Sequence, residues 1–372
     1  MYKILVFGMT DNYGGVERVI MNYYHEFDRK KIHFDFICNT LNKMAYEDEL
    51  EKNGSKIIHT IPKRENLNQY FREMKNFFKS NGSEYDCLWF NVNNLVNIDC
   101  VKLAKKYNIS KIIIHSHNSR IMEQGLKGAL KKQIHYHNRH KIEHYATDYW
   151  ACSKVAAEWL FPSKLNADIK IIKNAINVKS TEFNSLKRES LKKKYNLENS
   201  FVIGNVGRLH FQKNQLYMLD LFKGVLNHIP NAKFILVGEG PDKTKIEEKI
   251  KNLNLENKVL LAGMQKDMQA WYSLFDLFLF PSVFEGLSVA LLEAQANGIP
   301  IVSSDRVSPD EIKIHPNVKF ISLHNDREYW IKEIVNSSNH SRISSREVEN
   351  NFRKQGYEIT NAAKKVERML LQ

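Results

Sequence analysis

Two carboxylates, Glu285 and Glu293, are the residues of this chain whose type and spacing point most directly to chemistry. Glu285 follows the apolar run 278–280, which is typical of a buried strand, and that strand should end at Pro281. The Ala- and Leu-rich stretch from Val289 onward predicts a helix, with Glu293 one to two turns inside it. The two carboxylates should therefore flank a turn from a strand into a helix.

The backbone between these carboxylates can bind an anion. Gly286, Leu287 and Ser288 offer free amides where the helix begins, at the positive end of its dipole. Carboxylates accept hydrogen bonds from hydroxyls. The segment therefore suits a ligand that carries both an anionic group and several hydroxyls. The alternative is that Glu285 is a loop carboxylate and Glu293 a residue on a helix surface.

A second turn of this kind carries two cations. Arg208 and Lys213 follow the predicted strand 202–206 and precede the predicted helix 214–226. A guanidinium binds phosphate as a fork and an ammonium acts as a compact point charge, so the pair suits a diphosphate. A basic helix start on the surface is the alternative.

Gly14 and Gly15 follow the first predicted strand. Paired glycines there either let a ligand approach the backbone closely or simply form a tight turn.

Strand-like and helical patterns alternate twice along the 372 residues, enough for two domains. The first half has strand candidates at 3–7, 34–38, 56–60, 87–90, 111–115 and 149–152, with helices at 17–26, 67–79 and 99–106. The second half has strands at 202–206, 233–237, 259–261, 277–280 and 300–303, with helices at 214–226, 243–253, 268–275 and 288–296. We expect an α/β fold of two doubly wound, Rossmann-like parallel sheets, with a soft boundary in 171–200.

Composition excludes several classes of protein. Hydrophobic residues make up 43% of the chain, which is typical of a globular protein, and no apolar run approaches the ~20 residues of a membrane span. The short N-terminal apolar run reads as a strand rather than a signal sequence, so we expect a cytoplasmic protein. Four widely spaced cysteines and the histidines show no metal-ligand spacing, so we expect free thiols, no cofactor and no metal.

The ordered set of segments resembles the retaining glycosyltransferases of family 4, which have the GT-B fold. The resemblance rests on Glu-x7-Glu after a Pro-Ser strand end, on Gly-Arg-Leu-x-x-x-Lys-Asn at 207–214, and on the Gly14-Gly15 loop. His117, after the apolar run 112–114, matches the family's strand-end histidine better than His115. Residues 171–177 depart from the family's Pro-Asn-Gly-Ile-Asp segment. The opening of the chain looks most like bacterial capsule and exopolysaccharide members.

The resemblance implies a role for each of these side chains. Arg208 and Lys213 would stabilise the leaving diphosphate, Glu285 would bind sugar hydroxyls, Glu293 would bind the ribose, and His117 would position the sugar. The remaining donor-binding residues would act mainly through backbone groups: Gly14, Gly15, Gly286, Leu287, Ser288 and, beside the base, Met264. Retention at the anomeric carbon and independence of metal are implied with these roles.

The resemblance also implies an organisation and a reaction. Residues 1–172 would form the acceptor-side domain, joined by a C-terminal helix at 356–372, and residues 173–355 would bind the nucleotide sugar, with a cleft between them. The expected reaction moves a hexose-type sugar, from a UDP-sugar, to a glycan or polyprenyl-linked acceptor in surface polysaccharide synthesis. The rival functions are another GT-B enzyme, such as a sugar-nucleotide epimerase or a phosphorylase, and a non-catalytic membrane scaffold.

The formal net charge of +13 favours anionic partners. Lys127, Lys131 and Lys132 alternate with apolar residues in a predicted amphipathic helix, which suits either an anionic membrane surface or plain solvent. If the helix binds membrane, the protein is peripheral on the inner face of the cell membrane. Nucleic acid is not an expected partner, because no recognition signature accompanies the charge.

Overall fold

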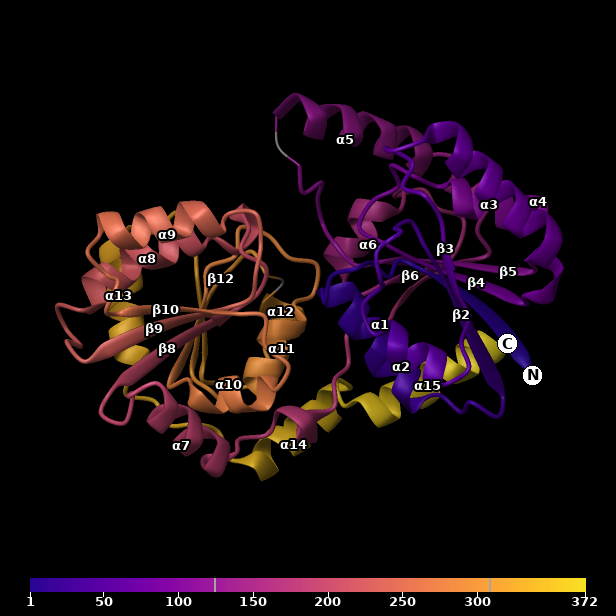
Figure 1. Cartoon of the computed structure of the whole chain (residues 1–372). Helices are drawn as coiled ribbons and strands as arrows, with labels where there is room; N and C mark the ends of the chain where they lie inside the picture. The colour runs from indigo at the N-terminus through magenta and orange to yellow at the C-terminus, as the bar shows by residue number, and fades with distance from the viewer. Residues whose placement is uncertain (124, 308) are drawn as a thin grey trace. The chain divides into compact units, whose positions relative to one another are not determined.

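The computed structural model describes residues 1–123, 125–307 and 309–372, which form two compact domains. The first domain comprises Met1–Ala175 and Thr360–Gln372, and the second comprises Ile176–Ile359. Each domain is a parallel sheet with helices on both faces (Figure 1). The expected α/β architecture of two Rossmann-like domains is thereby confirmed.

Seven parallel strands build the sheet of the first domain, in the order β3-β2-β1-β4-β5-β6-β7. Their bounds are β1 (Tyr2–Phe7), β2 (Ile32–Cys38), β3 (Ile57–His59), β4 (Cys87–Val92), β5 (Lys111–Ser116), β6 (Asp148–Ala151) and β7 (Ile169–Ile171). The central strands are continuous apolar runs because helices cover both of their faces. The edge strand β7 was not predicted, since it is three residues long, half-exposed, and centred on Lys170.

Helices cover both faces of this first sheet. They are α1 (Gly15–Glu26), α2 (Glu47–Lys52), α3 (Leu67–Asn81), α4 (Asp99–Lys106), α5 (Gly125–Arg139), α6 (Lys154–Leu160) and α15 (Ile359–Leu371), with short 3-10 turns η1 (Gly82–Glu84) and η2 (Ile142–His144). Helices α3 and α4 lie on one side of the sheet, and α1 and α15 lie on the other (Figure 1). The C-terminal helix therefore completes the first domain.

Specific contacts hold α15 to the first domain. Lys111 Nζ donates to the carbonyl oxygen of Met369 at 2.6 Å, at the negative end of the helix, where a cation is favourable. The Glu367 carboxylate accepts from the amide of Asp28 at 2.9 Å. The helix begins at Ile359, three residues after the approximate start expected at 356, because Gly356 adopts φ 73° and ends the preceding helix.

Six parallel strands build the second sheet, in the order β10-β9-β8-β11-β12-β13. They are β8 (Phe201–Val206), β9 (Ala232–Val237), β10 (Val259–Gly263), β11 (Leu277–Phe280), β12 (Ile301–Ser304) and β13 (Val318–Ile321). Strand β13 was not predicted. It is a four-residue edge strand in which Val318 and Ile321 are buried and Lys319 is exposed, a pattern too short to recognise in the sequence.

The helices of the second domain also lie in two layers. They are α7 (Ser185–Lys194), α8 (Gln215–Val225), α9 (Lys243–Asn252), α10 (Met268–Leu274), α11 (Val289–Ala296), α12 (Pro309–Ile312), α13 (Arg327–Ser337) and α14 (Ser345–Gln355), with 3-10 turns η3 (Val178–Thr181) and η4 (Phe211–Lys213). Helices α8, α9 and α13 cover one face, and α10 and α11 the other (Figure 1). Under α8 and α13 lies an apolar core that includes Phe222, Phe234 and Trp330.

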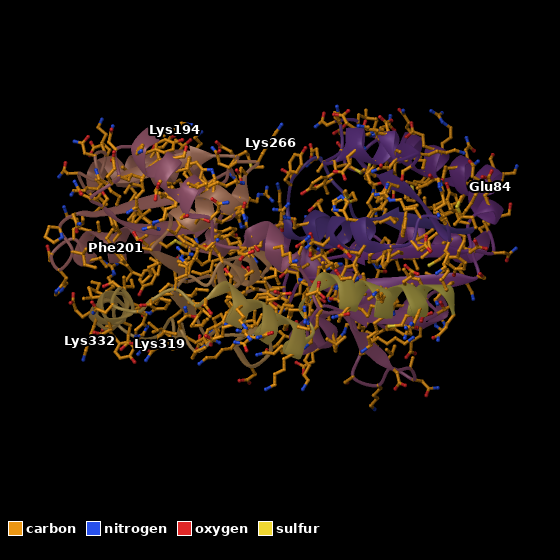
Figure 2. All side chains as sticks on the ribbon, turned by 90° about the horizontal axis from the view of Figure 1, so that it is seen from below. Glu84, Lys194, Phe201, Lys266, Lys319 and Lys332 are labelled. Carbon is orange, nitrogen blue, oxygen red and sulfur yellow. The ribbon has the colours of Figure 1, made fainter. Side chains whose placement is uncertain are left out.

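Part of the basic charge is carried on the outside of the second domain. Lys194, Lys319 and Lys332 are exposed and project outward from its rim (Figure 2). They stand on α7, β13 and α13, away from the predicted site motifs. These lysines are exposed surface charges away from the predicted motifs, so the net charge alone does not locate a binding site.

Each sheet reverses its strand order once. Strand β1 lies between β2 and β4, and β8 lies between β9 and β11. In open parallel sheets ligands bind beyond the carboxyl ends of the strands at such a switch point. The loops after β1 and β4 in the first domain, and after β8 and β11 in the second, are therefore the places where a site is expected.

Candidate active site

The second domain brings two predicted motifs together at its switch point. Lys213, in the turn η4 after β8, forms an ion pair with Glu285, in the loop after β11, with 2.7 Å between Nζ and Oε1. The side chains of the pair are 15% and 9% exposed, so solvent screens this interaction less than one on the surface. The ammonium also lies 4.8 Å from the centre of the Phe280 ring.

Hydrogen bonds around η4 hold the Lys213–Glu285 ion pair in place. The amide of Val283 donates to the carbonyl oxygen of Gln212 at 2.8 Å, and the Gln212 side chain donates to the carbonyl oxygen of Phe284 at 2.9 Å. Asn214 adopts a left-handed conformation with φ 64°, and its side chain donates to the carbonyl oxygen of Pro281. These contacts tie the loop after β8 to the loop after β11, so the ion pair is held by structure on both sides.

Arg208 differs from Lys213 in both exposure and pairing. Its side chain is exposed and forms no hydrogen bond or ion pair with any residue that the structure describes. Its backbone is nevertheless fixed, because its carbonyl oxygen accepts from the Gln215 side chain at 3.0 Å. Of the two predicted phosphate-binding cations, Lys213 is thus engaged with Glu285, whereas Arg208 is available to an incoming anion.

The start of α11 has the geometry expected from the sequence. Ser288 is the N-cap, with its hydroxyl accepting from the amide of Leu291 at 3.4 Å, and Gly286 and Leu287 precede it. Glu293 lies in the second turn and is buried. The hydroxyl of Tyr272, from α10, donates to Glu293 Oε2 at 2.9 Å. The sequence did not reveal Tyr272 as a candidate, because this contact joins two separate helices.

Glycines at the ends of three adjacent strands complete this edge of the sheet. Gly207, Gly238 and Gly263 follow or end β8, β9 and β10, and all three have positive φ. The amide of Gly207 donates to Val237, and that of Gly238 donates to Gly263. A Cβ on Gly238 would lie 2.2 Å from the carbonyl oxygen of Gly207, so only glycine fits there.

Met264 follows this row of glycines and is 54% exposed. Because β10 ends at Gly263, Met264 lies at the same carboxyl edge of the sheet as the η4 turn. Glu239, immediately after Gly238, pairs with Lys243 at 3.2 Å in the first turn of α9. Glu239 was not predicted as a site residue, since a single glutamate after an apolar strand carries no distinctive spacing.

In the first domain, His117 lies just beyond the end of β5 and is buried. Its Nε2 lies 2.9 Å from Oδ1 of Asn91 on β4. Burial lowers the pKa of His117 to about 3, so the ring is neutral at physiological pH. Gly8, after β1, has φ 120°, and a Cβ there would lie 2.7 Å from that of Asn91. Asn91 was not predicted, although it lies near the end of the apolar strand β4 at the switch point.

The loop with Gly14 and Gly15 opens α1, and Gly14 is the N-cap. Glu17 folds back over this loop: it accepts from the Thr10 hydroxyl at 2.7 Å, and a Cβ on Gly14 would lie 2.6 Å from Glu17 Oε2. Burial raises the pKa of Glu17, while hydrogen bonds from Thr10 and nearby amides oppose the rise. An anion that approaches Gly14 therefore meets a buried carboxyl group that the sequence did not predict.

The basic stretch forms α5, with a buried side and an exposed apolar side. His135, on the buried side, stacks on Trp159 with 4.1 Å between ring centres, and its Nδ1 accepts from the amide of Leu95 at 3.0 Å. Three apolar residues on the other side are exposed by 91%, 64% and 38%: Leu126, Leu130 and Ile134. Lys127, Lys131 and Lys132 lie beside this stripe, and Lys131 pairs with Glu123.

Neither a metal cluster nor a membrane span was found where the structure describes the chain. No group of three or more His, Cys, Asp or Glu side chains among residues 1–123, 125–307 and 309–372 could hold a metal ion. Within the same ranges, no helix combines the length and the apolar character needed to cross a bilayer. Cys38, Cys87, Cys100 and Cys152 are buried free thiols, as expected.

Comparisons with known proteins agree with this architecture. Residues 187–358 match the family model described as Glycosyl transferases group 1. The putative glycosyltransferase EpsF of Bacillus subtilis is 26% identical over 352 residues, which cover 93% of this chain and 90% of that protein. The crystal structure of Anabaena HepE in complex with UDP and glucose superposes with a TM-score of 0.80 at 17% identity, covering 100% of both chains.

A third relative matches more closely over a shorter segment. The UDP-Gal:alpha-D-GlcNAc-diphosphoundecaprenol alpha-1,3-galactosyltransferase of Escherichia coli is 37% identical over 110 residues, which cover 29% of this chain and 28% of that enzyme. The family model covers most of the second domain, where Lys213 meets Glu285, and the full-length relative extends the similarity across both sheets. Residues 187–358 are therefore similar to the group 1 glycosyl transferases, and the two sheets have the GT-B fold.

Proposed function

We propose that this protein transfers a hexose-type sugar from a UDP-sugar to a glycan or polyprenyl-linked glycan acceptor in the synthesis of a surface polysaccharide. The observation that carries the proposal is the Lys213–Glu285 ion pair beside the exposed Arg208, at the switch point of the second sheet. Two similar proteins support it: the Escherichia coli relative is named for a UDP-galactose donor and a diphosphoundecaprenol acceptor, and the HepE structure is a complex with UDP and glucose.

The leaving group sets the main electrostatic task of this reaction. As the bond between the anomeric carbon and the diphosphate oxygen breaks, negative charge accumulates on the diphosphate. Arg208 and Lys213 stabilise that charge, in the way that pre-placed cations lower the barrier of many transfer reactions. Because the two cations supply positive charge themselves, the proposed reaction needs no divalent metal. Amides at the start of α11 add the field of a helix N-terminus.

The remaining predicted residues bind and orient the donor. Glu285 accepts hydrogen bonds from sugar hydroxyls, and its pairing with Lys213 couples sugar binding to diphosphate binding. Glu293, held by Tyr272, accepts from the ribose hydroxyls. In the proposed retaining reaction the acceptor oxygen bonds to the anomeric carbon on the face that the diphosphate leaves. The proton of the acceptor hydroxyl passes to the departing phosphate, so no side-chain base is required.

We also propose that α5 places the protein on the cytoplasmic face of the membrane, where a polyprenyl-linked acceptor resides. The exposed stripe of Leu126, Leu130 and Ile134 would enter the interface between headgroups and acyl chains. Lys127 and Lys132 beside it would attract anionic lipid, at about 1 kcal/mol per residue. Charge and apolar surface on one helix favour this over a solvated helix.

The first test is thermal stability of the purified full chain with a panel of UDP-, GDP-, dTDP- and ADP-sugars in the presence of EDTA. A ligand that binds only the folded state stabilises it by about 2.7 kcal/mol at a hundred times its Kd. We expect selective stabilisation by UDP-sugars, followed by release of UDP that depends on an acceptor. A flat response, or turnover that releases no UDP, would favour the scaffold or the epimerase. A lysine-bound pyridoxal absorbance would indicate a phosphorylase.

A further inference from the structure

Four aromatic and amide side chains form a continuous line at the switch point of the first sheet. Trp89 and Asn91 lie on β4, and His115 and His117 lie on and just after β5, with Asn91 paired to His115 in the sheet register. Trp89 Nε1 donates to His115 Nδ1 at 3.3 Å, the two histidine rings are 4.1 Å apart, and His117 Nε2 lies 2.9 Å from Asn91 Oδ1. We call these four residues the tautomer chain.

Both ends of the tautomer chain have a fixed polarity. An indole N–H can only donate, so His115 Nδ1 must accept, and the proton of a neutral His115 must lie on Nε2. At the other end, the Asn91 amide nitrogen donates to the carbonyl oxygens of Phe7 at 3.3 Å and Trp89 at 3.2 Å. Those two acceptors orient the amide, so Asn91 Oδ1 faces His117 and accepts the proton on Nε2.

In the middle of the tautomer chain, the two histidine rings present a donor and an acceptor. His115 Nε2 and His117 Nδ1 are both buried, and neither has a hydrogen-bond partner among the residues that the structure describes. With the proton positions set by the two ends, the first atom is a donor and the second is a lone-pair acceptor. The two rings that carry these atoms are neighbours, with 4.1 Å between their centres.

The surroundings keep both rings uncharged. Burial lowers the pKa of His117 to about 3, and burial together with His117 lowers that of His115 well below its ordinary value. The titratable group that faces His117 is His115, and no carboxylate among the described residues contributes to the shift. Both rings are therefore neutral between pH 5 and 8, and each keeps a single N–H proton.

We infer that Trp89, His115 and Asn91 are positioning residues that hold His117 as a neutral ring with its proton on Nε2. His117 then serves transfer by the fixed placement of its ring and not as a general acid, a general base or a phosphate-binding cation. The inference rests on the proposed function only where it connects His117 to the donor sugar. The tautomer and charge of His117 are properties of the unliganded chain and can be measured without turnover.

The direct test is long-range proton–nitrogen correlation spectroscopy of the full chain with 15N-labelled histidine. The signals of His115 and His117 are assigned by their loss in His115→Gln and His117→Gln. We expect both rings to remain neutral Nε2–H tautomers from pH 8 to pH 5. A His117 signal that titrates near its ordinary pKa of about 6.5, or that shows an Nδ1–H tautomer, would overturn the inference.

The second test uses Asn91 variants in the transfer assay. Asn91→Ala removes the acceptor of the Nε2 proton, and we expect kcat to fall roughly 10- to 100-fold, since small displacements of positioning groups can cost that much. Asn91→Asp places a carboxylate beside His117, which favours the protonated ring. The plot of kcat against pH for this variant should then show a titration by His117 that the wild-type plot lacks. Asn317→Ala is the control, because Asn317 lies in the second domain and donates to the carbonyl oxygen of Gly298.

The two kinds of failure can be told apart. If no donor supports transfer but the spectra show two neutral Nε2–H rings, the proposed function fails and the tautomer chain stands. If transfer occurs but Asn91→Asp keeps the wild-type pH profile, His117 is not under the control of Asn91 and the inference is wrong. If the role of Asn91 is purely structural, its variants should have a lower melting temperature, and their plots of kcat against pH should show no new titration.

Discussion

Lys213 and Glu285 lie 72 residues apart in the chain, and their side chains meet with 2.7 Å between Nζ and Oε1. One follows β8 and the other follows β11, which are neighbours in the second sheet. The ion pair therefore joins the two motifs that carry the proposed diphosphate-binding and sugar-binding roles. A substitution at Lys213 should therefore change the energetic effect of a substitution at Glu285, and this coupling can be measured.

A double-mutant cycle at this pair tests the coupling. Lys213→Met removes the cation that faces the buried Glu285 carboxylate, and we expect it to lower the free energy of unfolding by about 1–3 kcal/mol. Glu285→Gln alone should cost less, and Lys213→Met with Glu285→Gln should recover much of the loss while remaining inactive. Urea denaturation and a transfer assay provide the two readouts. Additive stability changes would show that the pair is not coupled.

Arg208→Ala separates catalysis from folding. The side chain is exposed and unpaired among the described residues, so we expect stability to change by no more than about 0.5 kcal/mol. Loss of a charge that stabilises the transition state should lower kcat by about 10²- to 10³-fold. Arg346→Ala, at an exposed position on α14, is the matched control. A fully active Arg208→Ala enzyme would refute the diphosphate assignment.

Tyr272→Phe tests whether Glu293 binds the donor. The variant removes the hydroxyl that donates to Glu293 Oε2 at 2.9 Å and keeps the packing of the ring. Without that contact Glu293 is less well oriented, and we expect the donor KM to rise about tenfold, equivalent to about 1.4 kcal/mol. Tyr24→Phe is the control, because its hydroxyl lies in the first domain and makes a long 3.5 Å contact with Ser55. An unchanged KM would argue against donor binding by Glu293.

Vesicle binding tests the proposed role of α5. Replacing Leu126 and Leu130 with serine removes most of the exposed apolar stripe without touching the buried side of the helix. We expect sedimentation with vesicles containing anionic lipid to be lost, and wild-type binding to weaken as salt rises. Leu186→Ser removes a leucine that is 76% exposed on the basic helix α7 and should not alter binding. Equal vesicle binding by all variants would show that α5 is a solvated helix that does not bind the membrane.

Acid should destabilise this protein through its buried histidines. Burial lowers the pKa of His135 and of His315 to about 4 in the folded state. The unfolded state then binds more protons below pH 6.5, so stability present at neutral pH falls as pH drops from about 6.5 towards 4. His135→Gln should flatten this dependence in urea denaturation at pH 7.5, 6 and 5. An unchanged slope would show that His135 does not contribute.

Long-range contacts explain most of what the sequence left unpredicted at the site. Asn91, Tyr272 and Glu17 occur in segments without distinctive spacing, and each becomes informative only through a partner from another element or loop. The short edge strands β7 and β13 were missed for a related reason. Three or four residues carry too little periodicity, and only pairing with a neighbouring strand identifies them.

The sequence by itself determined the alternation of strands and helices, and hence the two parallel sheets, because apolar runs and helical spacing are local properties. It also located the motifs of Arg208, Lys213, Glu285 and Glu293 at turns from strand into helix. Only the tertiary structure decided that Lys213 is paired and Arg208 is exposed, since pairing depends on which strands become neighbours. Burial, and with it the neutral state of His117, likewise arises only when distant segments exclude water together.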